Sequence, residues 1–135
     1  MPKLTLRDFD YCWIDYLTKE GVRMIYDYSM KKNDPRGEWI LDLKLVGINP
    51  YTRLEGKTIE DRTILHEGLH AFVDLVLELP HEKEEIEKKV EEAEAYHYRR
   101  NKMYADYIRR CWVITPQPIP RKFSFLNTAI VVQKF

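Results

Sequence analysis

The sequence is poor in several features that mark common classes of protein. It has only two cysteines, Cys12 and Cys111, far apart and outside any C-x-x-C spacing, which excludes a disulfide framework and a cysteine-based zinc knuckle. No run approaches the roughly 18 apolar residues of a membrane span, and the N-terminus lacks a secretory signal pattern. The 22 basic and 22 acidic residues cancel, so no global field attracts nucleic acid or anionic lipid. We therefore expect a soluble, cytoplasmic protein with no membrane span and no nucleic-acid partner, in which any metal ligands are histidine and carboxylate.

The length and apolar content indicate a single domain, and the helix- and strand-like segments along the chain indicate the α+β class. The chain has 135 residues, 44% of them apolar, which is enough for one core of ordinary size. Residues 4–19 carry apolar side chains at helical spacing, and Gly21 follows as a typical helix end. Two strand-like runs come next, at 22–28 and 38–46, joined by a polar turn. We expect an N-terminal helix and a small antiparallel or mixed sheet, in which these two runs form a hairpin.

Two further helices and a tail complete the expected fold. Thr58 and Asp61 have the spacing of a helix start signal, and the apolar-rich segment that follows ends at a proline. A second, long helix with one apolar stripe is expected over residues 82–111. Residues 116–135 read as a proline-rich spacer and an extended, apolar C-terminal tail. We expect residues 1–115 to form one domain and the tail to pack on it, beside a sheet edge or across a substrate cleft.

The first of these two helices carries the pattern His66-Glu67-Gly68-Leu69-His70, or HExxH. Residues four apart project from one face of a helix, so both imidazoles can bind one metal ion at about 2.0–2.1 Å. Glu67 lies about 100° round the helix from His66, where it can miss the metal and reach a metal-bound water. Zinc lowers the pKa of that water toward about 7, and a carboxylate can take its proton as the water attacks a carbonyl. The motif therefore predicts a metallopeptidase in which His66 and His70 bind Zn²⁺ and Glu67 is the catalytic base.

A catalytic zinc needs a third protein ligand, for which the second helix offers two candidates. No third histidine follows in the HExxHxxGxxH position, where Val76 stands. A distal glutamate is therefore expected. Glu92 and Glu94 flank the apolar stripe of the second helix, about 100° to either side, and helical periodicity does not choose between them.

The two helices together resemble the gluzincin metallopeptidases, in which a second, glutamate-bearing helix contributes the third zinc ligand. The motif HEGLH is followed by the run EAEAYHY, which begins at Glu92. The likeness is greatest to the minigluzincins. It extends to the CAAX-prenyl-type peptidases, whose helix reads E-x-x-A-D, and to repressor-cleaving peptidases, which read E-x-x-A-N-x-F. The resemblance implies Glu92 rather than Glu94 as the ligand, with Ala95 as the alanine and Tyr98 as the aromatic residue. Tyr96 stands where those families have Asp or Asn.

These features give one leading expectation and two alternatives. The leading one is a zinc-dependent endopeptidase, a minimal zincin-like catalytic domain over residues 1–115, whose peptide or protein substrate lies along an edge strand. A second is a latent peptidase, or zymogen, whose tail over residues 116–135 blocks the cleft. The third is a non-catalytic zinc-binding regulatory or interaction module, in which Asp74, His97 or a tail residue closes the fourth position of the metal. Asp74 also fits a partner of His70, and His97 also fits a hydrogen-bonded core histidine.

Overall fold

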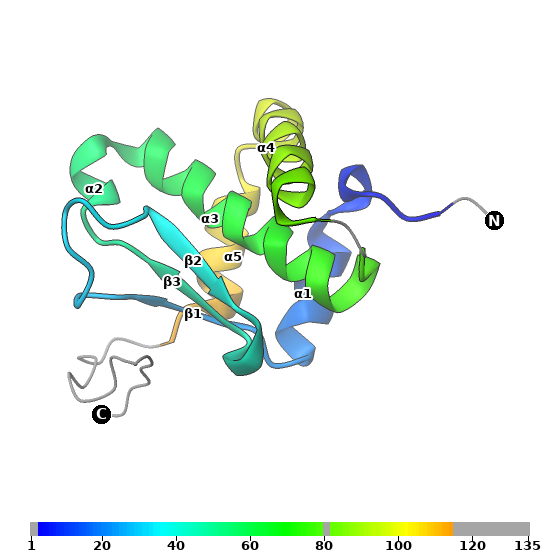
Figure 1. Ribbon diagram of the computed structural model, residues 1–135, viewed down its shortest axis with the longest axis horizontal. Helices are drawn as coiled ribbons and strands as arrows, with labels where there is room; N and C mark the ends of the chain where they lie inside the picture. Colours follow the sequence, from blue (N-terminus) through cyan, green and yellow to red (C-terminus); the bar gives the residue numbers. More distant parts are fainter. Residues whose placement is uncertain (1–2, 80–81, 115–135) are drawn as a thin grey trace.

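The computed structural model describes residues 3–79 and 82–114, and these form the predicted α+β fold (Figure 1). The helices are α1 (Tyr11–Lys19), α2 (Thr52–Glu55), α3 (Lys57–Phe72), α4 (Lys83–Arg100) and α5 (Tyr104–Trp112). The strands are β1 (Arg23–Tyr26), β2 (Gly37–Ile40) and β3 (Leu45–Ile48). Helix α3 runs through the middle of the molecule, where it contacts the sheet, α4 and α5. None of the described helices is both long and apolar enough to cross a membrane.

The small sheet is mixed, and its strand order differs from the expected hairpin. Strand β3 lies in the centre, parallel to β1 and antiparallel to β2, so the runs at 22–28 and 38–46 do not pair as two adjacent strands. The second run breaks at the turn Leu41–Leu43, and Lys44 then takes a left-handed conformation with φ of 50°. This reversal folds β3 back onto β2. All four residues of β3 are buried, which is typical of a central strand.

The predicted N-terminal helix is shorter than expected because its first turn is a separate element. Thr5 and Asp8 form the predicted capping box, but it closes a single 3₁₀ turn, Leu6–Asp8. Phe9 is extended, and Asp10 then caps α1 by accepting the backbone N–H of Trp13 at 3.1 Å. The break lets Phe9 turn into the core beside α1.

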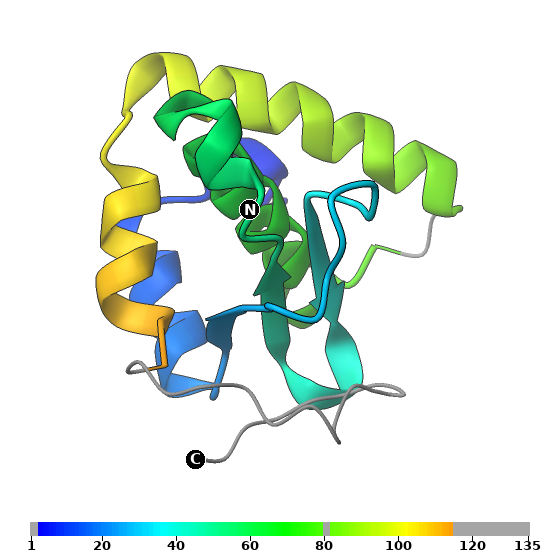
Figure 2. The same cartoon turned by 90° about the vertical axis from the view of Figure 1, so that its left-hand side faces the viewer.

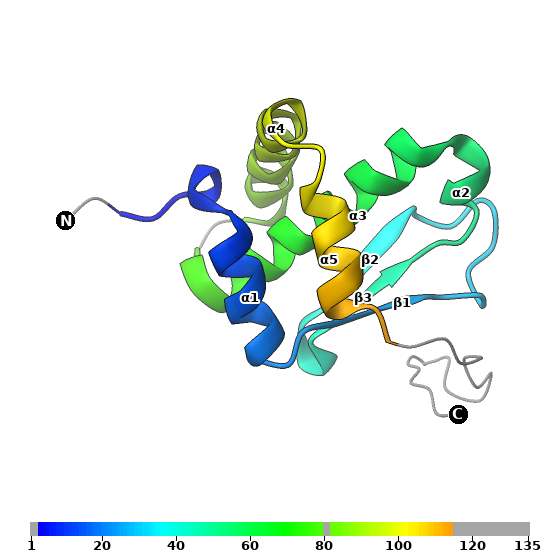
Figure 3. The ribbon, with the colours of Figure 1, turned by 180° about the vertical axis from the view of Figure 1, so that it is seen from behind.

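The long helix expected over residues 82–111 is divided at Asn101. This residue is extended, with φ of −153° and ψ of 98°, and its side-chain oxygen accepts the N–H of Met103 at 2.9 Å. The chain therefore turns, and α5 runs back against α1 and α3 instead of continuing α4 (Figure 3).

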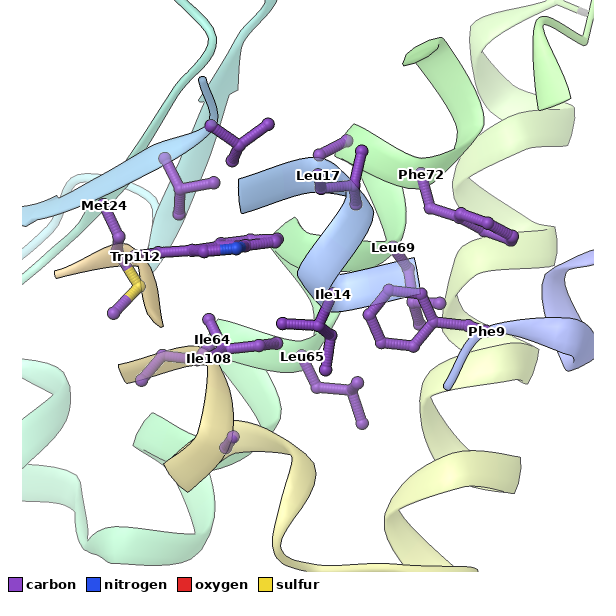
Figure 4. Close-up of a cluster of buried hydrophobic side chains, with 14 of the residues drawn as sticks. Phe9, Ile14, Leu17, Met24, Ile64, Leu65, Leu69, Phe72, Ile108 and Trp112 are labelled. Carbon is purple, nitrogen blue, oxygen red and sulfur yellow. The ribbon is translucent and has the colours of Figure 1, made fainter. Parts of the chain in front are cut away.

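The hydrophobic core lies between α3, α1, α5 and the sheet (Figure 4). Its largest fully buried side chains are Phe9, Ile14, Leu17, Met24, Ile48, Ile64, Leu65, Leu69, Phe72, Ile108 and Trp112. The last described residues return to the outer side of β1, where Ile114 donates its N–H to the Met24 carbonyl at 3.0 Å. The predicted spacer and tail over 116–135 lie outside the described residues.

The core position of α1 gives a test of the packing. Replacing Ile14, which is fully buried, with alanine removes contacts and leaves a cavity, so we expect the free energy of unfolding to fall by about 2–5 kcal/mol. Urea unfolding followed by circular dichroism measures this. The control is Cys12→Ala on the same helix, where the side chain is exposed and the change should stay within about 0.5 kcal/mol. Equal effects of the two substitutions would contradict the packing described here.

Candidate metal centre

Helix α3 brings His66 and His70 together on the face that looks away from the core. Their ring centroids lie 5.0 Å apart, and both side chains are half-buried. The opposite face packs on α5: a Cβ added to Gly68 would lie 3.2 Å from Ile108 Cδ1 and 3.5 Å from the ring of Trp112. The glycine in mid-helix therefore allows close packing of α5. That packing fixes the rotation of α3 and directs the two imidazoles toward α4.

Glu87 from α4 completes a group of three side chains that could hold a metal ion. Its Oε2 lies 3.0 Å from His66 Nε2, and its Oε1 lies 2.8 Å from His70 Nε2. One ligand atom from each of the three residues lies within 4.8 Å of the others. Tetrahedral zinc with bonds near 2.1 Å separates its ligand atoms by about 3.4 Å. Two nitrogens and a carboxylate oxygen at this spacing suit zinc in both chemistry and size.

The structure does not bring Glu92 to the histidines. Helix α4 places Glu87, Glu91 and Glu94 within about 60° of one another on the face toward α3, whereas Glu92 lies about 140° from Glu87. Glu92 instead lines a separate hollow beside the N-terminal segment, with Leu4 among its neighbours. Figure 2 shows α4 crossing α3, so that one face of α4 alone can meet the HExxH motif.

Glu94, the alternative third ligand, lies behind the centre as a hydrogen-bond partner of His66. Its Oε1 is 2.9 Å from His66 Nδ1, and its Oε2 accepts from Arg62 Nε at 2.5 Å. A carboxylate can only accept, so His66 donates from Nδ1 to Glu94, and Nε2, which faces Glu87, is the nitrogen that the neutral ring would offer to a metal. Such a carboxylate orients a ligating histidine and raises its basicity.

Burial and the neighbouring carboxylates act in opposite directions on the two histidines. Burial lowers the pKa of His66, but the hydrogen bond to Glu94 and the charges of Glu67 and Glu87 outweigh it, so the pKa is raised. For His70 burial prevails over the contact with Glu87, and the pKa is lowered. A lowered pKa favours the neutral imidazole, which is the form that binds metal.

Glu67 lies on the floor of the same cleft, deeply buried and without a partner. Its side chain is 7% exposed, and it makes no hydrogen bond or ion pair with the residues that the structure describes. Burial, assisted by the charge of Glu87, raises the pKa of Glu67 to about 7 against the opposing effect of His66. Gly37 of β2 covers it so closely that a Cβ there would lie 2.9 Å from Glu67 Cγ.

The cleft itself is open, with a volume of about 430 Å³ between the loop before β2, α3 and α4. The two described residues proposed to close a metal's fourth position lie elsewhere. Asp74 accepts a hydrogen bond from Trp39 Nε1 at 2.7 Å, and its charge acts on His70 without a hydrogen bond or ion pair between the two described side chains. His97 is 3% exposed in the core, with Nε2 at 2.8 Å from the Leu6 carbonyl oxygen, as expected for a hydrogen-bonded core histidine.

The sequence alone did not single out three residues of this site. Glu87 and Arg62 are charged residues on helices rich in charge, and nothing local distinguishes them. Gly37 reads as a turn residue, because its contact with Glu67 spans thirty positions of the chain. The available signal for Glu87 was its spacing of four and seven residues from Glu91 and Glu94, which puts the three on one helical face.

Comparison with known proteins found no match to this chain. No protein-family model matches the chain, and neither the curated proteins nor the solved structures contain a match. The function therefore has to be inferred from the side chains of the centre and their geometry.

We predict that zinc affinity separates the three glutamates of α4. Glu87→Gln removes a ligand charge and should weaken zinc binding by at least about 100-fold. Glu94→Gln, which removes only the partner of His66, should weaken it by about 10–100-fold. Glu92→Gln is the matched control, with the same change of charge on the opposite face, and should leave affinity unchanged. Competition titration against a chromophoric chelator measures all three.

His70→Ala should lower the affinity as much as Glu87→Gln does. If Glu92→Gln abolished zinc binding while Glu87→Gln kept it, the third ligand would be the one that the gluzincin resemblance implied, and the placement of α4 described here would be wrong.

Proposed function

We propose that the chain is a zinc-dependent peptidase that hydrolyses peptide bonds at this cleft. One observation carries the proposal: Glu67, buried and unpartnered, lies beside two histidines and a glutamate that suit zinc, on the floor of an open cleft. An unsatisfied buried carboxylate is costly, by about 1–3 kcal/mol or more, and such groups concentrate at catalytic sites. His66, His70 and Glu87 are the proposed ligands.

The chain's own residues have distinct roles in this proposal. Zinc would supply a Lewis acid and an acidified water. Glu67 would take up a proton at its carboxylate as a general base and later return it to the departing amine as a general acid. Arg62 and Glu94 hold His66 in one tautomer. Gly37 leaves the Glu67 side chain the space that a Cβ would take.

The edge of the sheet supports a peptide as the substrate. Among the described residues β2 pairs only with β3, on one side, and Asn49 donates its N–H to the Arg36 carbonyl at 2.8 Å. Hydrogen bonding alternates along an antiparallel pair, so the backbone groups of Gly37 and Trp39 point to the free edge. Gly37 lines the cleft directly above Glu67. An extended peptide can therefore add to β2 while one of its carbonyls reaches the metal centre.

The third ligand also improves the likeness to the gluzincin helix pattern. With Glu87 in the ligand position, the pattern E-x-x-A-D falls on Glu87, Val90 and Glu91. A small apolar residue and a carboxylate then occupy the fourth and fifth positions, whereas the register on Glu92 puts Tyr96 in the fifth. The shift by five residues thus supports the gluzincin-like proposal.

The decisive experiment separates zinc binding from hydrolysis. Glu67→Gln keeps the shape of the side chain and removes its ability to take a proton, so we expect peptide hydrolysis to fall by about 10²–10⁴-fold with one zinc still bound per chain. A quenched fluorescent peptide library and metal analysis of the same samples measure the two properties. Wild-type protein that binds zinc and hydrolyses nothing would favour the non-catalytic zinc module instead.

Gly37→Ala tests the position of Glu67 without changing a charge. The new methyl group would lie 2.9 Å from both Glu67 Cγ and Thr63 Cγ2, so the Glu67 side chain must move. We expect kcat to fall at least about tenfold while zinc affinity stays the same. Gly47→Ala on the neighbouring strand is the control, since its Cβ would lie 3.9 Å from its nearest neighbour, Asp27 Cβ. Equal kcat values in the two variants would contradict the contact between Gly37 and Glu67.

A further inference from the structure

The cleft carries one exposed carboxylate that has no hydrogen bond or ion pair with the described residues. Helix α4 contributes Glu87, Glu91 and Glu94 to the lining. Glu87 contacts both histidines of the centre, and Glu94 contacts His66 and Arg62. Glu91 is exposed on the same wall and makes no hydrogen bond or ion pair within residues 3–79 and 82–114.

The cationic side chains that line the cleft already have partners. Arg36 binds Glu55 through two contacts, from Nε at 2.9 Å and from Nη2 at 3.2 Å. Arg62 binds Glu94 through Nε. A dication held by the histidines would be balanced by the charges of Glu87 and Glu67. The charge of Glu91 remains after each of these pairs is formed.

The cleft has the features of a site that receives a polar ligand. Glu67 lines it with a side chain that is more than nine-tenths buried and has no partner in the described parts of the chain. The walls on either side are the loop before β2 and helix α4. A chain lying along the free edge of β2 would therefore enter a cleft that both Glu67 and Glu91 line. An uncompensated negative charge on that path attracts a cationic side chain and repels an anionic one.

We propose that the cleft selects peptides with a lysine or arginine beside the scissile bond, and that Glu91 is the residue that makes the selection. As far as it concerns cleavage, this inference rests on the proposed peptidase function. An exposed ion pair is worth little in water, but the partly enclosed walls of the cleft reduce solvent screening. We expect attraction to raise kcat/KM for a lysine peptide about threefold and repulsion to lower kcat/KM for a glutamate peptide about threefold. The two effects together give about a tenfold difference between matched peptides.

The test uses internally quenched, alanine-based decapeptides that carry a single lysine or a single glutamate at each of four positions on either side of the centre. For wild-type protein we expect kcat/KM to be about tenfold higher for lysine than for glutamate at one position or more. Glu91→Gln should bring this ratio close to one, and Glu91→Lys should invert it. Glu92→Gln has the same change of charge on the other face of α4 and should keep the ratio. Raising the salt to 0.5 M should shrink it.

A binding measurement keeps this proposal separable from the proposed hydrolysis. The same peptides with a neutral dye are titrated into Glu67→Gln protein and into the Glu67→Gln, Glu91→Gln double variant, and anisotropy reports binding. A lysine preference that disappears in the double variant supports selection by Glu91 even if wild type cleaves nothing, in which case only the hydrolysis fails. A lysine-to-glutamate ratio that Glu91→Gln leaves unchanged, in cleavage or in binding, overturns the role of Glu91 while the hydrolysis stands.

Discussion

Helix α3 packs on the core with one face and turns a polar face toward α4 and the cleft, and both the core and the centre depend on this division. Leu65 and Leu69 face α1 and α5, and Gly68 allows Ile108 and Trp112 to lie against the helix backbone. The rotation of α3 is fixed by that contact. Its polar face then has to be covered by an element that can satisfy half-buried imidazoles, because an unpaired polar group in a partly dry site is costly. The acidic face of α4 meets this requirement.

The resulting polar chain runs from Arg62 through Glu94 and His66 to Glu87 and His70. Each member has an opposite charge or a hydrogen-bond partner beside it, which makes a partly buried polar network tolerable. Glu67 is the buried exception within the described cleft. A carboxylate kept in the protein interior without a partner is difficult to explain by stability alone, and for that reason it carries the proposed function.

Sequence reasoning succeeded where structure is local and failed where it depends on distant contacts. The fold class, the capping box at Thr5 and the helical stretch through the HExxH motif follow from spacing within a few residues. The expected pairing of β1 with β2 was wrong, since the turn at Leu41–Leu43 inserts β3 between them. The long second helix was also wrong in its extent. Its apolar stripe continues in phase, and only the packing of α5 against α1 and α3 shows that the chain turns at Asn101.

By itself the sequence determined the pair of histidines and the carboxylate between them, because residues four apart share a helix face whatever surrounds the helix. It also determined the buried stripe of α4, which includes Val90, Ala93 and His97. Only the tertiary structure decided which flank of that stripe faces α3, and hence that Glu87 rather than Glu92 approaches the histidines. Periodicity defines the angle between residues on one helix. It carries no information on the side from which a second helix approaches or on how far it slides along the first, which long-range packing alone sets.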